Sequence, residues 1–319
     1  MRWSALVSTL SLRPRGARAQ GHRGRSSGFV QQKKNEDNRS DDPDQPTGAG
    51  GGRRSKELVF AFFGGVVHGR DLPAVPTAVF LRLFGALGVA PAAARATLAR
   101  MTRNGLLERI KVGRTAHYRL TPSTEALIRK AAVRVESAAP FEHPDGQWTL
   151  LSYSMPETRR DLRHRLRSAL TWAGFGGLRD GLWIAPGIVD VAEVFADAGL
   201  SEATGLADWF AASPLPGVQV DELVRRAWPV DQIRAQHEQF VRTWWTWSEE
   251  DDPLVQLTLL GADWLRVLRA DPGIPARHLT PDWPAAQSAA VYRRCHQALL
   301  PRAERRLDRE LGLTALDPS

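Results

Sequence analysis

The segment of residues 89–120 restricts the fold of this chain more than any other part of the sequence. Pro91 suits the first turn of a helix, where its missing N–H leaves no hydrogen bond unmade. At 100° per residue, three apolar side chains share the face that we expect to be buried. These are Ala94, Leu98 and Met101. Asn104-Gly105 then ends the helix, because both residue types tolerate a left-handed backbone.

The opposite face of this predicted helix combines small residues with arginines. Small side chains let a helix sit deep in the major groove of DNA, while guanidinium groups reach phosphates or guanine edges. The sequence therefore predicts a DNA-contacting face. Its candidate residues, with Ala92 beside them at the start of the helix, are Arg95, Ala96, Ala99, Arg100 and Arg103.

Two strand-like segments, LLERIKV and AHYRLT, follow around the turn Gly113-Arg114-Thr115. We expect Lys111, Arg114 and His117 to contact the sugar-phosphate backbone of DNA. A helix followed by a basic hairpin is the second half of a winged helix-turn-helix. The alternative is a solvated amphipathic helix beside an ordinary hairpin.

Positive charge is unevenly distributed along the 319 residues, whose formal net charge is +8. Residues 1–56 carry 12 basic and 5 acidic side chains, and residues 57–130 carry 11 and 4. Residues 131–319 have 20 basic and 26 acidic side chains. A basic module on an acidic body is typical of a protein that binds nucleic acid at one end. It argues against a nucleic-acid enzyme with a basic channel throughout.

Other features of the sequence indicate the cellular compartment of the protein. Its single cysteine, Cys295, excludes a disulfide framework and indicates a reducing compartment, so we expect a cytoplasmic protein. We expect no membrane span, because no run of about 18 apolar residues occurs. Residues 1–56 are predicted to be a disordered basic and glycine-rich tail, although SALVSTLSL weakly resembles a signal-peptide core. A mis-assigned start site is another interpretation of this tail.

The predicted fold class is α+β with several domains. Apolar helices from Ser55 onward, together with the helix and hairpin above, form a winged helix-turn-helix DNA-binding domain over residues 57–122. Residues 123–144 are a connector helix and linker. The order β-α-β-β-α-β predicts a ferredoxin-like central domain over residues 145–227, with Asp180-Gly181 in a hairpin turn. Leu162, Leu166 and Leu170 should face inward from its first helix.

Residues 228–319 are predicted to be helical, with a last helix that begins at Pro301. Ten of the 11 tryptophans follow residue 140, and Trp244, Trp245 and Trp247 cannot all lie on one helix face. We expect two of these three in the core and one in an interface or pocket. His164 and His237 lie in predicted helices, where solvated or capping roles are expected.

Three longer segments together resemble the PaaX-like family of bacterial phenylacetic acid degradation repressors, over about residues 57–311. They are ARATLARMTRNGLLERIKVGRTAHYRLTP, GQWTLLSYSMPETRRDLRHRLRSALTWAGFGGLRDGLWIAPG and DPGIPARHLTPDWPAAQSAAVYRRCHQALLPRAERRL. The third is the most specific, although Ala285 stands where the family usually has glycine after Asp-Trp-Pro. The resemblance implies a homodimeric repressor that leaves DNA when an aryl-acyl-CoA, typically phenylacetyl-CoA, binds. Two-fold symmetry then implies double-stranded DNA with a palindromic operator.

An acyl-CoA effector needs an apolar slot and cations for its phosphates, and no cofactor is expected. Tryptophans near arginines in the C-terminal region are the candidate effector site. The candidates are Arg225, Arg226, Arg242, Trp245, Trp283, Arg293 and Arg294. The central domain is expected to form the dimer contact.

Two other functions compete with that of a ligand-controlled regulator. The central domain resembles the small ferredoxin-like nucleases of CRISPR systems, which hold a metal with an aspartate at the end of their first strand. This chain has Tyr153 and Ser154 there and no acid before Glu157, which disfavours a metal-dependent nuclease. No HExxH or similar spacing indicates a zinc site. An architectural DNA binder without a ligand would leave the tryptophan-rich half unexplained.

Overall fold

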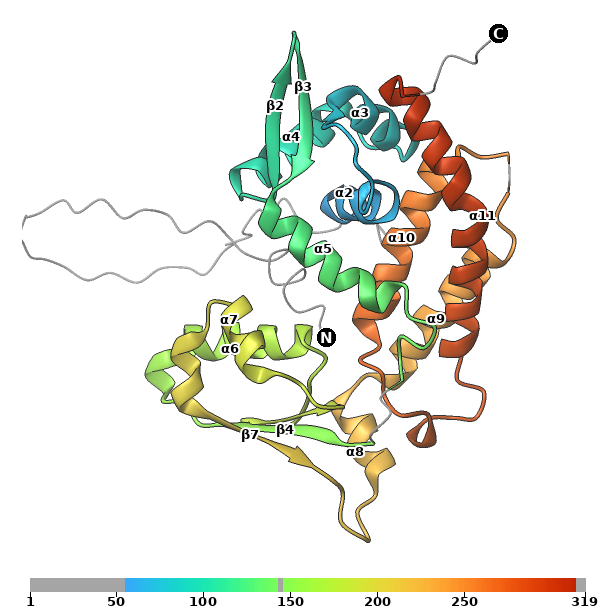
Figure 1. Ribbon diagram of the computed structural model, residues 1–319. Helices are drawn as coiled ribbons and strands as arrows, with labels where there is room; N and C mark the ends of the chain where they lie inside the picture. The colour runs from blue at the N-terminus through green and yellow to red at the C-terminus, as the bar shows by residue number, and fades with distance from the viewer. Residues whose placement is uncertain (1–54, 143–145, 249, 314–319) are drawn as a thin grey trace, which may run out of the picture.

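The computed structural model describes residues 55–142, 146–248 and 250–313. The predictions for the tail therefore fall outside the described residues, except at its last two positions. The described chain is α+β, with two separate antiparallel sheets and a helical C-terminal region (Figure 1). None of the helices in these ranges is long and apolar enough to span a membrane.

The N-terminal part contains helices followed by a hairpin, as the sequence predicts. The three-stranded sheet has the order β1-β3-β2, and the turn of the β2–β3 hairpin contains Gly113 at φ 59°. The first helix does not end at Phe62 but continues as one turn of π-helix, Phe63–Val67. The other elements are α2 (Ser55–Phe62), β1 (Val75–Pro76), α3 (Thr77–Ala86), α4 (Pro91–Arg103), β2 (Leu107–Val112), β3 (Thr115–Leu120) and α5 (Pro122–Val135).

The central part has the predicted element order β-α-β-β-α-β. Its four strands pair antiparallel in the order β5-β6-β4-β7. Gly181 lies in the predicted turn at φ 72°, and a Cβ there would come within 2.5 Å of the Tyr153 carbonyl oxygen. Only glycine fits this turn. The elements are β4 (Trp148–Tyr153), η2 (Glu157–Arg159), α6 (Arg160–Trp172), β5 (Gly176–Arg179), β6 (Leu182–Pro186), α7 (Val191–Asp197), η3 (Ser201–Leu206) and β7 (Ala207–Ala212).

Side chains alternate between the two faces of the central sheet, as the strand period requires. Leu151 and Trp183 pack with the inward leucines of α6, Leu162, Leu166 and Leu170, which confirms the predicted face of that helix. Trp148 and Ile184 point to the other face and pack with Trp228. The sheet is therefore covered on one side by α6 and α7 and on the other by α8 (Val220–Ala227) (Figure 1).

The C-terminal part is helical, with one departure from the prediction. The helix expected to begin at Pro301 is instead the continuation of a single long helix, with Pro301 in its interior. The buried stripe Cys295, Leu299, Ala303 and Leu307 runs through the proline, which is itself exposed. Packing along this stripe offsets the missing backbone hydrogen bond. The elements are α8 (Val220–Ala227), α9 (Val230–Trp245), α10 (Pro253–Ala270), η4 (Ala276–His278) and α11 (Ala285–Leu311).

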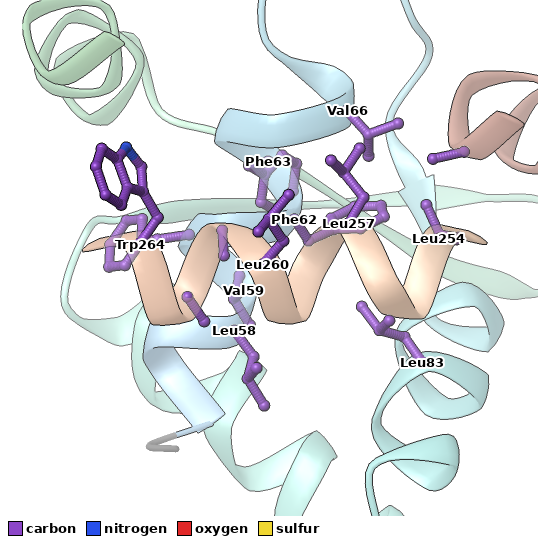
Figure 2. Packing of buried hydrophobic residues seen from close by; sticks show 14 of the residues in the cluster. Leu58, Val59, Phe62, Phe63, Val66, Leu83, Leu254, Leu257, Leu260 and Trp264 are labelled. Atoms are coloured by element: carbon purple, nitrogen blue, oxygen red, sulfur yellow. The ribbon is translucent and has the colours of Figure 1, made fainter. Parts of the chain in front are cut away.

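One hydrophobic core joins the N-terminal helices to the C-terminal ones. Phe62 and Phe63 from α2 and the following π-turn pack against Leu257 and Leu260 of α10, and all four side chains are fully buried or nearly so (Figure 2). Leu83 of α3 belongs to the same cluster. The predicted domain limits stay a prediction, but the residues proposed to contact DNA lie on elements whose core extends to the C-terminal helices.

His237 overturns the sequence expectation of a solvated or capping residue. Its side chain is fully buried in α9, with Nδ1 3.0 Å from Ser288 Oγ and Nε2 2.9 Å from Asp271 Oδ2. The partners lie far away in the sequence, which is why helix position alone did not reveal them. His164 is exposed, as expected.

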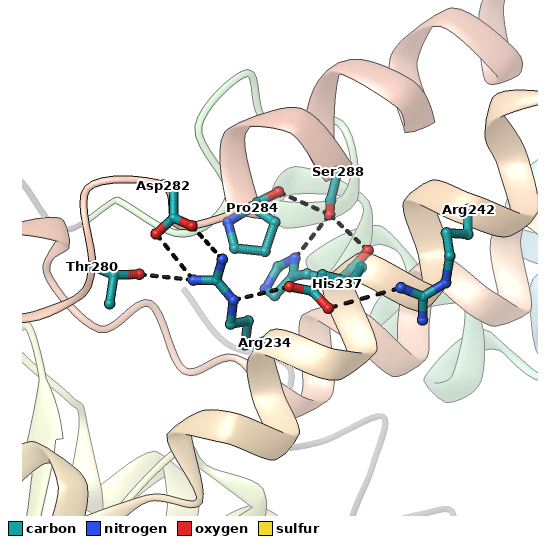
Figure 3. A network of polar contacts seen from close by, with 8 residues as sticks. Arg234, His237, Arg242, Thr280, Asp282, Pro284 and Ser288 are labelled. Carbon is teal, nitrogen blue, oxygen red and sulfur yellow. Dashed lines mark hydrogen bonds and ion pairs between the residues drawn. The ribbon is translucent and has the colours of Figure 1, made fainter.

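A second polar cluster on α9 fixes the loop that carries the Asp-Trp-Pro motif. Arg234 donates two hydrogen bonds to the Asp282 carboxylate, at 2.6 and 3.2 Å, and one to Thr280 (Figure 3). The hydrogen bonds that the Asp282 carboxylate accepts, chiefly from Arg234, lower the pKa of Asp282 to about 2. The motif thus anchors the loop before α11 to α9.

Candidate nucleic-acid interface

The helix α4 has the buried and exposed faces that the sequence predicts. Ala94, Leu98 and Met101 are buried together with Thr97. The residues proposed to contact DNA from this helix are all exposed, and so is Ala92 beside them. They are Arg95, Ala96, Ala99, Arg100 and Arg103. Gly105, at φ 69°, follows the helix, so the predicted left-handed stop is confirmed at the glycine, while Asn104 keeps a negative φ.

The arginines of α4 are not neutralised by neighbouring carboxylates. Arg95 and Arg103 make no hydrogen bond or ion pair with the described residues, and Arg100 only reaches Thr97 Oγ1 at 3.3 Å. Two other arginines of the N-terminal part do form ion pairs with residues of α11. Arg70 contacts Asp308 at 2.6 Å, and Arg82 pairs with Glu310.

The β2–β3 hairpin extends beside α4 and adds cations of the same kind (Figure 1). Lys111 and Arg114 are exposed and have no ion-pair partner among the described residues. Arg109 shares these properties but was missed in the sequence analysis. Strand alternation could have found it, because Arg109 and Lys111 are two residues apart on β2. We call the exposed cations Arg95, Arg100, Arg103, Arg109, Lys111 and Arg114 the basic surface.

His117 differs from the other hairpin candidates. It is half-buried, with Nδ1 2.9 Å from the Ala74 carbonyl oxygen and Nε2 2.9 Å from Thr115 Oγ1. Both ring nitrogens are therefore occupied within the protein. The imidazole ties β3 to the chain before β1, so it supports the hairpin from inside.

The candidate effector residues do not converge on one place. Arg294 lies 4.9 Å from the ring centroid of Trp245, which is exposed, and donates to the Trp244 and Trp245 carbonyls. Arg242 contacts Glu238, and Arg293 donates to the Ala138 carbonyl oxygen. The other three candidates lie apart from Arg294 and Trp245. Arg225 and Arg226 are exposed on α8, and Trp283 packs near His237.

Two of the three clustered tryptophans pack in the core, as predicted, while the interface or pocket role of the third stays a prediction. Trp244 is buried, Trp247 is half-buried against the same core, and Trp245 is 56% exposed.

Ser288, His237 and Asp271 have the residue types of a hydrolytic triad, but the site cannot admit a substrate. All three side chains are buried. The rings of Phe141 and Trp283 lie at 5.0 and 6.1 Å from the imidazole. Ser288 Oγ also lies 3.0 Å from the Pro284 carbonyl oxygen. The cluster therefore joins α9 and α11 to the segment after α10.

The end of β4 carries no carboxylate. Tyr153 is the last residue of the strand and is buried, and Ser154 follows it. Over the described ranges, no three histidine, cysteine or acidic side chains gather in a way that could hold a metal ion. These residues do not fit the metal centre that a nuclease of the CRISPR type requires.

Three sequence families match consecutive parts of the chain. A PaaX-like protein family matches residues 54–124, the PaaX central Cas2-like domain matches residues 142–223, and the PaaX-like C-terminal domain matches residues 228–309. The chain belongs to the PaaX-like family. The basic surface lies within the first of the three matches.

Two relatives illustrate the relationship. The Transcriptional repressor PaaX of Escherichia coli (strain K12) is 25% identical over 244 residues, which cover 69% of this chain and 73% of the repressor. The uncharacterized protein Rv0674 from Mycobacterium tuberculosis has a similar structure, with a TM-score of 0.53 and 23% identity. That similarity covers 79% of this chain and 97% of the other, and it concerns the fold alone.

Proposed function

We propose that this PaaX-like protein is a transcription repressor that binds double-stranded DNA through the basic surface. The relationship to a repressor supports the broader role of a transcription regulator. The observation that carries the proposal is the set of exposed cations on α4 and the hairpin, which lack carboxylate partners among the described residues. Such cations are available to replace the counterions of a phosphate backbone.

In this proposal, α3 and α4 form the helix-turn-helix and the β2–β3 hairpin is its wing. The turn between the helices spans residues 87–90 and includes Gly88 at φ 74°. The exposed alanines of α4 allow close approach to the base pairs, while Lys111 and Arg114 lie on the hairpin, near the flanking phosphates. The central β-α-β-β-α-β part would be the ferredoxin-like unit that joins two copies into a homodimer on a palindromic operator.

The first test measures binding to the promoter region of the protein's own gene by fluorescence anisotropy over a series of salt concentrations. Arg100→Ala should weaken binding by about 1 to 3 kcal/mol and reduce the salt slope by about one counterion. Arg160→Ala, an exposed arginine on α6, is the matched control and should change neither quantity. Unchanged affinity and slope in Arg100→Ala would exclude α4 as the contact helix.

The effector part of the proposal is release of DNA by an aryl-acyl-CoA such as phenylacetyl-CoA, acting by a shift between two dimer arrangements. This would place the protein at a catabolic operon for aromatic acids, in the cytoplasm. A DNA complex that ignores acyl-CoA compounds would instead indicate an architectural protein. Mg²⁺-dependent cleavage of nucleic acid by the pure protein would indicate a nuclease.

A further inference from the structure

A cavity of about 800 Å³ lies where the central sheet meets the C-terminal helices. Its walls come from α6, the β5–β6 hairpin, the residues around the start of α9 and the end of α10. The residues with most chemical interest are Arg163, Arg167, Arg179, Trp183, Gln236 and Arg269. None of them is among the effector candidates from the sequence. The volume is in the range of about 300 to 1,000 Å³ that is typical of small-ligand sites.

The charge of this cavity is strongly positive. Four arginines line it, against one carboxylate, Asp180. Arg167 and Arg179 are exposed and have no ion-pair or hydrogen-bond partner among the described residues. Arg163 is partly satisfied by Glu157 at 3.1 Å and by the Met155 carbonyl oxygen at 2.7 Å. The cations left unpaired favour an anionic occupant.

The cavity also collects buried polar atoms without a partner. The Tyr153 hydroxyl, Trp183 Nε1, Gln236 Oε1 and Arg269 Nε are buried and unpaired in the structure, and all four residues line the same cavity. Tyr153 and Trp183 are only 9% and 7% exposed. Most buried polar groups have hydrogen-bond partners, so four exceptions around one cavity indicate a place for a ligand or for water.

Aromatic rings supply the apolar part of the lining. Phe175, Trp183 and Trp228 line the cavity beside the arginines. Gly176 lets β5 lie close to the Trp228 ring, because a Cβ on it would lie 2.8 Å from that ring. An aromatic group can stack on such rings while its charged end meets the guanidinium groups.

We propose that this cavity binds an amphipathic anion with an aromatic group, and that Arg269 transmits its occupancy to the N-terminal helices. This inference rests on the proposed function, since it locates the effector site and its route to the DNA-binding part. Arg269 Nη1 donates to Glu57 Oε1 on α2 at 2.9 Å, and its guanidinium lies 5.2 Å from the ring centroid of Trp172. An anion in the cavity competes with Glu57 for the same guanidinium.

The helix α2 can pass this change to the DNA-binding part because it shares a core with α4. Val59 and Phe62 of α2 belong to the same buried cluster as Leu98 of α4. Leu260 of α10 is also in this cluster, and Figure 2 shows it beside Val59 and Phe62. Loss of the Glu57–Arg269 pair weakens the contact between α2 and α10. The ligand thereby favours an arrangement of the basic surface that differs from the DNA-bound one.

The binding test uses isothermal titration calorimetry on the full chain without DNA. The probes are phenylacetyl-CoA, coenzyme A and phenylacetate in separate titrations, which distinguish the phosphate-bearing part from the aromatic acid. Arg167→Gln and Arg179→Gln should each weaken binding of the best probe at least fivefold. Arg226→Gln, an exposed arginine of α8 outside the cavity, should leave it unchanged. Equal affinities in all four proteins, or no binding of any probe, would overturn the proposal.

The coupling test measures DNA affinity with and without the same probe. Glu57→Gln should bind the probe at least as tightly as the wild type does, because the competing carboxylate is removed, but the probe should change its DNA affinity at least threefold less. An unaltered response in Glu57→Gln would refute the role of the Glu57–Arg269 pair. If the chain binds the probe with cavity dependence but never binds DNA, the proposed function fails while the site remains.

Discussion

His237 and Arg269 show how much of this molecule depends on single polar contacts between distant segments. His237 is held by Asp271 and Ser288, which are 34 and 51 residues away. Arg269 contacts Glu57 across 212 residues. Buried polar groups are costly when unpaired, so these contacts select one packing of the helices over others.

His296 provides a prediction about pH. Burial lowers its pKa below 6.5, although Glu136 and Glu304 act in the opposite direction. The folded state therefore disfavours the protonated imidazole, and the associated stability is present above about pH 6.5 and lost as the pH falls below that value. The melting temperature of His296→Gln should fall less between pH 7.5 and pH 5.5 than that of the wild type.

The control for this experiment is His164→Gln, since His164 is exposed on α6. Its melting temperature should follow the wild-type pH dependence. If His296→Gln shows the full wild-type loss on acidification, another group is responsible for it.

At the scale of single elements, local patterns were reliable where one face of a helix or strand is buried. The faces of α4 and α6 and the hairpin turn at Asp180-Gly181 are as predicted. The predicted helix start at Pro301 was wrong. Proline favours the first turn of a helix, but tertiary packing overrides this preference here and keeps Pro301 inside α11. The π-helical turn over Phe63–Val67 was not predicted either, because nothing in the pattern of apolar residues indicates it.

Pro301 gives a prediction at this scale. In the interior of α11 its ring removes one backbone hydrogen bond, at an exposed position. Pro301→Ala should therefore raise the free energy of unfolding by about 1 to 3 kcal/mol, measured by urea denaturation. Pro122→Ala is the control, because Pro122 occupies the first turn of α5 and its N–H is not needed there. A loss of stability in Pro301→Ala would show instead that Pro301 stabilises the folded protein.

At the scale of the whole molecule, the N-terminal helices share one continuous hydrophobic core with the C-terminal helices. Val59, Phe62, Phe63 and Val66 are buried in a cluster that includes Leu257 of α10. We therefore expect a ligand or mutation that shifts α10 to affect the position of α4 through this packing.

This shared core predicts the behaviour of a fragment. Residues 54–124 alone would expose the apolar side chains that α10 covers, so they should lack a cooperative unfolding transition. Circular dichroism during heating measures this, with the full chain as the cooperative control. A sharp transition in the fragment would show that the N-terminal part is an independent domain.

The order of the elements, the amphipathic faces and the accumulation of cations on one helix and hairpin all follow from the sequence. They depend on residues within a few turns of each other, where side-chain spacing dictates which face is buried. Only the tertiary structure determines which charges are neutralised, that His237 is buried and where the arginine-lined cavity forms. Those properties arise from segments up to 238 residues apart, such as Arg70 and Asp308, whose meeting is set by packing of the entire core.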